Sequence, residues 1–535
     1  MLQDVYNAAR RPLSSRYDAV VVGAGMGGLV AALMLAARGW SVAILEKSPR
    51  VGGKLREIRV GDRGIDAGPT VFTMRPVFEA IFAAVGARLD DYLKLTRAEI
   101  LARHHWQDGS CFDLHADKGE TADAVGRLAG AAEARGYLDF CRRTEQVFQS
   151  LNASFMEHPS PSPLGLARNA GLGGLAALTR IRPFTTLSKV VEGYFCDPRL
   201  RQIFGRYATY CGSSPFEAPG PLMLIAHVEQ SGVWLVEGGM IRIAEALESL
   251  ARQQGVDIGL DCEVAEILIA DGAANGVRLA SGQVIEASAV VFNGDPAALF
   301  GGLAGDGVRH AVPPWGLADR SLSAITWSIL ARAGGFPLSR HTVFFSSDYR
   351  REFADIFDRH QLPSDPTIYI CAQDRDASLP GADPRGDERL LLLVNAPARA
   401  DDKPLSIAET QSCERSVTER LARAGLVLEG SQDRRRMTTP SDFAAMFPGS
   451  GGALYGRASH GWMASFQRPG ARARVQRLYL AGGAVHPGPG IPMAALSGTH
   501  AAQAAASDLA STASFHAMAT PGGMSTRSAT TGSWR

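Results

Sequence analysis

The sequence predicts an α/β protein in which a discontinuous Rossmann-type nucleotide-binding domain carries an inserted domain with a mixed β-sheet. Three observations lead to this fold class. They are a strand–turn–helix–strand unit near the N-terminus, a β-rich stretch at residues 255–296, and a glycine- and proline-rich stretch at residues 479–498, which opens as a strand, breaks at Gly482 and Gly483 and resumes as a helix near Ile491. The chain has 535 residues, 46% of them hydrophobic, which is enough apolar material for two or three subdomains.

Charge and cysteine content exclude several classes of protein. Lys and Arg total 55 against 54 Asp and Glu, a net charge of +1, so no nucleic-acid partner is expected. The seven cysteines include no CxxC pair, which argues against a disulfide framework and against a metal site. We therefore expect a protein of the reducing cytoplasm without a bound metal.

The N-terminal unit "YDAVVVGAGMGGLVAALMLAARGWSVAILEK" has the order of a βαβ motif. Residues 17–22 form a β-branched run typical of a buried parallel strand, residues 29–38 a helix that ends at Gly39, and residues 41–46 a second strand. The run from 19 to 37 is uncharged, but the glycines in its middle favour a turn over a membrane span.

The turn of this unit has the residues that a dinucleotide site requires. Gly23 allows the tight turn, Gly25 the approach of the pyrophosphate, and Gly28 the packing of helix against strand. Glu46 ends the second strand, where its carboxylate is placed to bond ribose hydroxyls. Because the strand, the helix and Glu46 all stand at the expected spacing, the sequence favours a dinucleotide-binding unit over a Rossmann unit that has lost its ligand.

Two further turns favour a long, enclosed cofactor, as FAD is. "EKSPRVGGKLRE" places Gly52 and Gly53 beside Lys54 directly after the second strand, and "IDAGPTVFTM" exposes backbone again at residues 68–70. An NAD-binding unit would continue directly to its next helix.

The remaining chain returns to the nucleotide-binding domain twice. Residues 255–296 alternate as strands, with hairpin turns expected at "GAANG" and "SGQ" and a buried strand at residues 289–293. The predicted nucleotide-binding domain thus comprises residues 1–75, 234–297 and 470–510. Residues 76–233 and 298–469 are expected to bind substrate and to include a helical part that associates with a membrane, and residues 511–535 are expected to form a disordered tail.

The inserted parts combine helices with strands. Helical periodicity covers residues 122–151, strand-like runs occupy residues 323–332, 341–347, 366–373 and 389–397, and a helix is expected at residues 406–425. Residues 163–195 form a basic amphipathic segment, which either lies on a membrane surface or is a helix facing the core.

Taken together, "VVGAGMGGLVAALMLAARG", "EKSPRVGGK", "DAGPTVFTM" and "YLAGGAVHPGPGIPMAALSG" resemble the phytoene-desaturase-type carotenoid desaturases of bacteria. The likeness also covers "YATYCGSSPFEAP", "GVWLVEGGMIRIAEAL" and "HTVFFSSDYRREF". Within this family, "DAGPTVFTMRPVFEAIF", "LMLIAHVEQSGVWLVEGGM" and "PTIYICAQDRD" look most like the 1-hydroxycarotenoid 3,4-desaturases.

The resemblance implies an FAD-dependent oxidoreductase that introduces a C-3,4 double bond into a long polyene, a 1-hydroxy or 1-methoxy acyclic carotenoid such as hydroxyneurosporene. It further implies a cytoplasmic protein associated peripherally with the inner, photosynthetic membrane, with oxygen or a quinone as electron acceptor. Hydride would pass to the flavin while a neighbouring carbon loses a proton.

The resemblance also implies the residues that bind FAD. Gly23, Gly25, Gly28 and Glu46 hold the ADP half with Val264 beside the adenine, Gly53 and Lys54 flank the pyrophosphate, and the loops 68–71 and 482–493 border the flavin. The complete predicted set is Gly23, Gly25, Gly28, Glu46, Lys47, Gly53, Lys54, Gly68, Pro69, Thr70, Val71, Val264, Asn293, Gly482, Gly483, Ile491, Pro492 and Met493.

Other features of the site stay open. Gly483 stands where many related flavoproteins place an acidic residue for the ribityl chain, so those hydroxyls must bond backbone or water. No catalytic residue is assigned, although His227, Glu229 and Asp295 are candidate bases, and His486 is expected to brace its loop. Neither the oligomeric state nor the partner of the substrate hydroxyl follows from the sequence.

Three alternative functions remain: a phytoene desaturase, an amine-oxidase-like flavoenzyme, and a carrier of isoprenoids without catalysis. The second would require an aromatic pair that "AGGAVHPGPGIP" lacks. The phosphate-turn glycines and Glu46 argue against the third.

Overall fold

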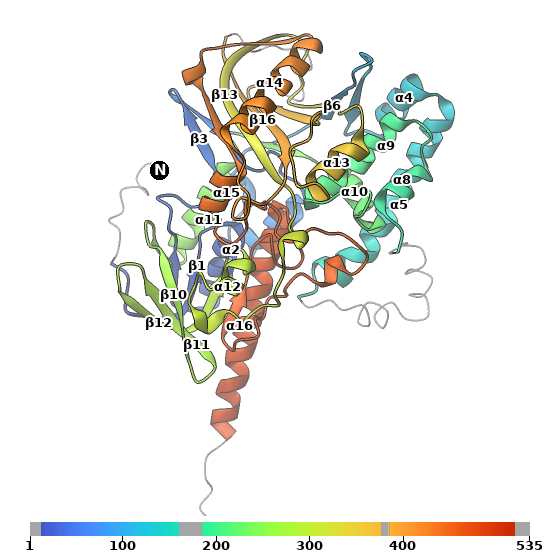
Figure 1. Ribbon diagram of the computed structural model, residues 1–535. Coiled ribbons are helices and arrows are strands. Elements are labelled where there is room, and N and C mark those ends of the chain that lie inside the picture. The colour runs from blue at the N-terminus through green and yellow to red at the C-terminus, as the bar shows by residue number, and fades with distance from the viewer. Residues whose placement is uncertain (1–11, 160–183, 376–383, 385, 519–535) are drawn as a thin grey trace, which may run out of the picture.

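The computed structural model describes residues 12–159, 184–375, 384 and 386–518. Two large sheets dominate, one in the lower and one in the upper part of Figure 1, and a group of helices lies beside them. Within the described residues, no helix is both long enough and apolar enough to cross a bilayer. Most of the basic segment 163–195 lies outside the described residues, which include its last part, the short helix α8 (Leu187–Glu192).

The first sheet is the predicted Rossmann-type sheet. Its strand order is β10-β11-β12-β1-β2-β9, and β19 pairs with β12 beyond the end of β11. Strands β1, β2, β9, β12 and β19 are parallel, and β10 and β11 are antiparallel additions at one edge. The bounds are β1 (Arg16–Val22), β2 (Val42–Leu45), β9 (Asp257–Gly259), β10 (Val264–Ala270), β11 (Ala273–Leu279), β12 (Val284–Phe292) and β19 (Leu478–Leu480).

Both faces of this sheet are covered, which explains why β1 reads as a continuous apolar run. Val21 packs into the core under the helices, and Val20 packs on the opposite face with β10, β11 and α12. The helices concerned are α2 (Met26–Ala36), α3 (Arg75–Ala83), α11 (Ile241–Gln253), α12 (Pro296–Phe300) and α16 (Ile491–Met518).

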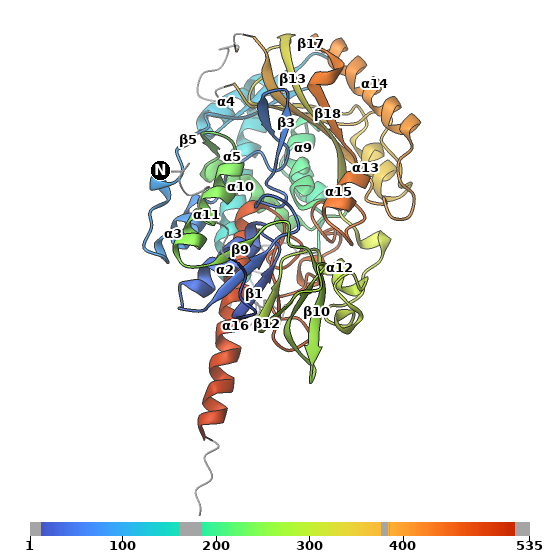
Figure 2. The same cartoon turned by 90° about the vertical axis from the view of Figure 1, so that its left-hand side faces the viewer.

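Helices α2 and α16, from opposite ends of the chain, lie directly against each other (Figures 1 and 2). Their contact depends on glycine, because a Cβ on Gly498 would lie 2.3 Å from the carbonyl oxygen of Gly27. Helix α16 also continues beyond Ser511, where the sequence had indicated the start of the tail. The alanine-rich run at residues 501–510 has high helix propensity, and residues 511–518 extend a helix that is already formed, which costs less than starting one; residues 519–535 lie outside the described part.

One predicted turn is wrong. The sequence "GAANG" predicts a hairpin turn, but β10 and β11 are joined at Asp271 and Gly272, and the following residues belong to β11. Both residues have positive φ, 51° and 74°, as a two-residue turn of this kind requires. The other predicted turn, "SGQ", does connect β11 to β12.

The second sheet is mixed, with strand order β17-β13-β16-β15-β14-β6-β7 and with β18 also pairing with β13. Only β14 and β6 run parallel among its pairs. The bounds are β6 (Ile100–His105), β7 (Cys111–His115), β13 (Ser323–Gly335), β14 (His341–Phe344), β15 (Ile368–Ala372), β16 (Glu388–Ala396), β17 (Leu426–Glu429) and β18 (Arg435–Thr438). Four of these strands coincide with the strand-like runs of the sequence.

The outer face of the second sheet is covered by the predicted helix α14 (Ile407–Arg423), whose Cys413, Val417 and Leu421 pack on it. The inner face turns toward the first sheet. Two small ribbons, β3 (Glu57–Val60) with β4 (Arg63–Asp66) and β5 (Leu95–Arg97) with β8 (Trp234–Val236), link the two halves.

Six further helices form a third group around one core. Their bounds are α4 (Lys118–Ala129), α5 (Ala131–Leu151), α8 (Leu187–Glu192), α9 (Pro198–Gly205), α10 (Leu224–Ser231) and α13 (Tyr349–Phe357). Helix α15 (Pro440–Met446) is not part of this group and contacts β13 of the second sheet. In α5, Tyr137, Phe140, Cys141, Thr144 and Val147 are buried at the helical spacing that the sequence predicts.

Candidate active site

The turn between β1 and α2 leaves no room for side chains. Gly23 has a φ of +98°, and a Cβ on Gly25 would lie 2.8 Å from Asn293 Nδ2. A Cβ on Gly28 would lie 2.1 Å from the carbonyl oxygen of Gly23, so Gly28 permits the packing of helix on strand. No side chain caps the start of α2, whose first N–H groups are therefore available to a phosphate.

Glu46 is held beside this turn by two backbone amides. Its Oε2 accepts a hydrogen bond from the Ala24 N–H at 2.7 Å, and its Oε1 accepts one from the Ser48 N–H at 2.9 Å. The carboxylate is buried, yet it also lines the central cavity. Because each carboxylate oxygen has more than one lone pair, both retain acceptor capacity for ribose hydroxyls.

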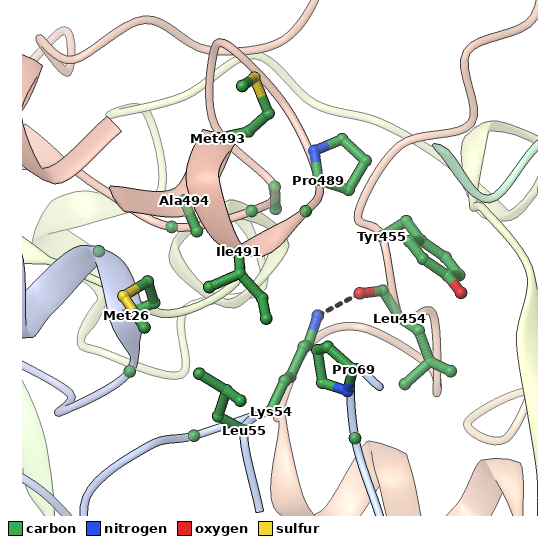
Figure 3. A pocket seen from close by; sticks show the side chains of 18 of the residues that line it. Met26, Lys54, Leu55, Pro69, Leu454, Tyr455, Pro489, Ile491, Met493 and Ala494 are labelled. Atoms are coloured by element: carbon green, nitrogen blue, oxygen red, sulfur yellow. Dashed lines mark hydrogen bonds between the residues drawn. The ribbon is translucent and has the colours of Figure 1, made fainter. Parts of the chain in front are cut away.

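A second loop closes over the turn. Gly52 donates its N–H to the Ala24 carbonyl at 2.9 Å. Gly53 has a φ of +59°, and a Cβ on it would lie only 3.1 Å from Gly25 Cα. Lys54 reaches away from the turn and donates from Nζ to the Leu454 carbonyl at 2.6 Å (Figure 3). Burial lowers the pKa of Lys54.

The C-terminal loop forms the facing wall. Gly482 follows β19 with a φ of +112° and donates its N–H to Ser497 Oγ at 2.7 Å. Helix α16 begins at Ile491, as the sequence predicts. Figure 3 shows Pro489, Ile491 and Met493 on one side of an open space and Lys54 with Pro69 on the other.

These segments enclose one end of a cavity of about 1600 Å³. Every residue of the predicted FAD set lines it, except Gly28, which lies behind the turn. The cavity exceeds the usual size of a small-molecule pocket. Three features of this end fit a dinucleotide such as FAD. Its turn has glycines at positions where a side chain would clash, the Glu46 carboxylate is held in place, and the first N–H groups of α2 are uncapped.

The other end of the cavity is formed by the inner face of the second sheet. This floor combines apolar with polar side chains: Val343, Leu391 and Leu393 are apolar, and Thr326, His341, Tyr369 and Asn395 carry polar groups. The helical group contributes further apolar side chains: Leu151, Leu222, Leu224, Ile225 and Val228. A long apolar ligand that reaches this end would be shielded from water.

The three candidate bases lie in different surroundings. His227 is not among the residues that line the cavity; its ring packs on Phe148. Glu229 lines the cavity and accepts a hydrogen bond from the Tyr207 hydroxyl at 2.8 Å, and burial raises its pKa. Asp295 caps α12 by accepting from the Ala297 N–H at 3.0 Å, and burial raises its pKa also. Both carboxyl groups therefore have structural partners.

His486 braces its loop against the segment that follows α5. Its Nε2–H donates to the carbonyl oxygens of Phe155 at 3.0 Å and His158 at 2.9 Å. His500 of α16 stacks on it with ring centroids 6.0 Å apart and donates from Nε2 to the Glu157 carbonyl at 3.0 Å. Burial is the main cause that lowers the pKa of both histidines to about 4.

Several polar residues of the cavity are not among those predicted from the sequence. Arg468 is buried and donates to the carbonyl oxygens of Tyr455 at 2.9 Å and Arg457 at 2.5 Å. Arg206 lies over the rings of Tyr210 and Tyr369. These residues come from distant parts of the chain and form no local motif.

The family model for flavin containing amine oxidoreductases matches residues 26–506. The chain belongs to this family. It is therefore a flavin-containing oxidoreductase, consistent with the way its loops enclose the cavity.

Curated members of this family are similar over nearly the whole chain. The hydroxyneurosporene desaturase of Rubrivivax gelatinosus is 49% identical, covering 96% of this chain and 98% of its own length. That of Cereibacter sphaeroides is 45% identical, covering 92% and 98%. The zeta-carotene-forming phytoene desaturase of Myxococcus xanthus is 32% identical, covering 89% and 92%.

A solved structure of the amine oxidoreductase fold agrees with the architecture. The oxidoreductase from Methanosarcina mazei superimposes with a TM-score of 0.56 over 90% of this chain and 98% of its own, at 16% sequence identity. At that identity the likeness concerns the fold alone.

Proposed function

We propose that this protein is an FAD-dependent desaturase that introduces a C-3,4 double bond into 1-hydroxy or 1-methoxy acyclic carotenoids such as hydroxyneurosporene. The observation that carries the proposal is one continuous cavity, which joins the phosphate turn and the C-terminal loop to a sheet floor with the apolar residues Val343, Leu391 and Leu393. The 49% identity to a hydroxyneurosporene desaturase supports the choice of substrate.

The predicted cofactor residues divide by their place in the cavity. The start of α2 with Gly23 and Gly25 would hold the pyrophosphate, Glu46 the ribose, and Val264 would lie by the adenine. The loops 68–71 and 482–493 would border the ring system. FAD, when bound, supplies a two-electron acceptor for a hydride from an allylic carbon.

The protein's own residues contribute to the reaction by orienting the polyene and by excluding water from the cavity. The floor residues Val343, Leu391 and Leu393 hold the polyene against an apolar wall, and the exclusion of water protects a reactive carbon centre during the transfer. With Glu229 and Asp295 engaged elsewhere, we assign no protein base.

The substrate test compares two polyenes on the purified, FAD-loaded enzyme with oxygen or a quinone as acceptor. We expect 1-hydroxyneurosporene to gain one conjugated double bond, seen as a red shift of its absorption, and phytoene to remain unchanged. A red shift with phytoene alone would instead identify a phytoene desaturase, the alternative that the relative from Myxococcus xanthus represents. A protein that cannot bind FAD would favour the carrier.

We also propose that the enzyme takes its substrate from the surface of the inner membrane. Phe184 and Trp462 both line the cavity, are 77% and 45% exposed, and contact each other with ring centroids 5.1 Å apart. Such a pair at the mouth of an apolar cavity suits a lipid interface.

A liposome assay tests this membrane contact. Replacing Phe184 and Trp462 together by serine should weaken co-sedimentation with liposomes by about tenfold or more, given the apolar area removed. Ile407→Ser is the matched control, because Ile407 is also 77% exposed but does not line the cavity. Equal effects of both changes would contradict the proposal.

A further inference from the structure

Hydrogen bonds join two polar side chains of the cavity floor to a third on the loop above it, and we call these three side chains the polar chain. The Tyr369 hydroxyl lies 2.6 Å from Thr70 Oγ1 and 2.8 Å from His341 Nδ1. All three residues line the cavity, and Val343, Leu391 and Leu393 beside them are apolar. Polar groups in such surroundings cost free energy unless they serve a ligand or a structural contact.

The polar chain of Thr70, Tyr369 and His341 links the two ends of the cavity. Tyr369 and His341 belong to adjacent strands of the floor, and Thr70 belongs to the loop predicted to border the flavin. The Arg206 guanidinium lies 5.4 Å from the centre of the Tyr369 ring and holds it in place. Thr70 and Tyr369 are half-buried and His341 is buried, so Thr70 is the half-buried end of the polar chain.

The chemistry of the proposed substrate requires a polar group at this place. Its hydroxyl is on C-1, only two carbons from C-3, where the new double bond forms. Whatever binds the hydroxyl must therefore lie beside the reacting carbons. Because a buried hydroxyl without a partner is unfavourable, an apolar site there would reject this substrate.

We propose that Thr70 binds the oxygen on C-1 of the substrate and that Tyr369 and His341 position the Thr70 hydroxyl for this bond. The inference rests on the function proposed above and names its specificity-determining residue. It makes the selection of hydroxylated polyenes a local property of this polar chain.

The polar chain can point in either direction. Burial, reinforced by the charges of Arg340 and Arg206, lowers the pKa of His341 to about 3, so its imidazole is neutral. If Tyr369 donates to Nδ1 and Thr70 donates to Tyr369, the Thr70 oxygen accepts from a substrate hydroxyl. If Nδ1–H donates to Tyr369 and Tyr369 donates to Thr70, the Thr70 hydroxyl can donate to an ether oxygen. One site thus accepts hydroxyl and methoxy substrates.

The test measures equilibrium binding of two polyenes to the FAD-loaded protein under anaerobic conditions, by quenching of protein fluorescence. The probes are 1-hydroxyneurosporene and 1,2-dihydroneurosporene, which lacks only the hydroxyl. We expect the wild type to prefer the hydroxylated compound by about tenfold. Thr70→Val should abolish this preference, Thr70→Ser should retain it, and Tyr369→Phe should reduce it.

Thr326→Val is the matched control. Thr326 lines the same floor, and within the described residues its buried Oγ1 has no hydrogen-bond partner. This variant should keep the wild-type preference. Because the preference is a ratio on one protein, a general loss of flavin or of folded protein lowers both affinities and leaves the ratio interpretable.

The outcomes separate the two proposals. A wild type that lacks any preference for the hydroxylated polyene would overturn the proposed substrate. A wild type that shows the preference, together with a Thr70→Val variant that keeps it, would overturn the role of Thr70 alone. Loss of the preference in Thr326→Val as well would place the hydroxyl elsewhere on the floor.

Discussion

The stacked histidines His486 and His500 should make the folded protein sensitive to mild acid. Their Nε2–H groups donate to carbonyl oxygens, so Nδ1 carries no proton, and neither Nδ1 atom has a partner among the described residues. Protonation would bury a charged N–H without an acceptor. This explains why the pKa of each falls from its usual 6.5 to about 4.

The magnitude follows from the two pKa values. A group whose pKa is lowered by folding stabilises the native state fully above its unfolded pKa, and this contribution is lost as the pH falls toward the folded pKa. For a shift from 6.5 to about 4, each histidine costs about 2 kcal/mol at pH 5. Going from pH 7 to pH 5, the pair should remove roughly 3 to 4 kcal/mol of unfolding free energy.

The assay compares urea unfolding at pH 7 and pH 5 for the wild type and for the double variant His486→Gln with His500→Gln. Glutamine can donate to the same carbonyl groups but does not titrate, so the other ionisable groups contribute equally to both proteins. We expect the wild type to lose about 3 to 4 kcal/mol more than the variant. Equal losses in the two proteins would refute the reasoning.

Three further changes test the cofactor end of the cavity and the second sheet. Gly28→Ala should weaken FAD binding by about tenfold or more, because its methyl group would meet the Gly23 carbonyl at 2.1 Å; Gly334→Ala, with open space around it, is the control, and flavin absorbance is the measurement. Glu46→Ala leaves the buried Ala24 N–H without its acceptor, so titration of apoprotein with FAD should give a Kd raised roughly 5- to 150-fold. Glu388→Gln removes the carboxylate that holds the buried Arg375 in a two-point ion pair; a loss of about 3 to 5 kcal/mol in unfolding free energy is expected, and no change would show that the pair is dispensable.

The parts of the fold that depend on local sequence were predictable. The glycine turn, the helix after it and Glu46 follow each other within thirty or so residues, and the structure brings Glu46 to the turn through Ala24. The turn at Asp271 and Gly272 was equally local, and its Asp-Gly pair was the correct signal. Asn275 and Gly276 form a second turn-like pair four residues on, but they belong to β11.

Contacts between distant segments were not predictable from one sequence. Thr70 and Tyr369 are 299 positions apart, and His486 and Phe155 are 331 apart. No periodicity or motif couples such pairs, because their meeting depends on how the two sheets and the helical group pack. The polar chain on the cavity floor therefore became visible only in the structure.

The contact between α2 and α16 bears on how the enzyme is made. Gly27 and Gly498 meet only when the last strand and helix have been synthesised, and the wall at residues 482–493 comes with them. A growing chain thus carries an exposed phosphate turn from its first residues but cannot enclose the flavin until translation is nearly complete. A chain that ends before β19 would lack β19, the wall at residues 482–493 and the whole of α16, and so one side of the cavity.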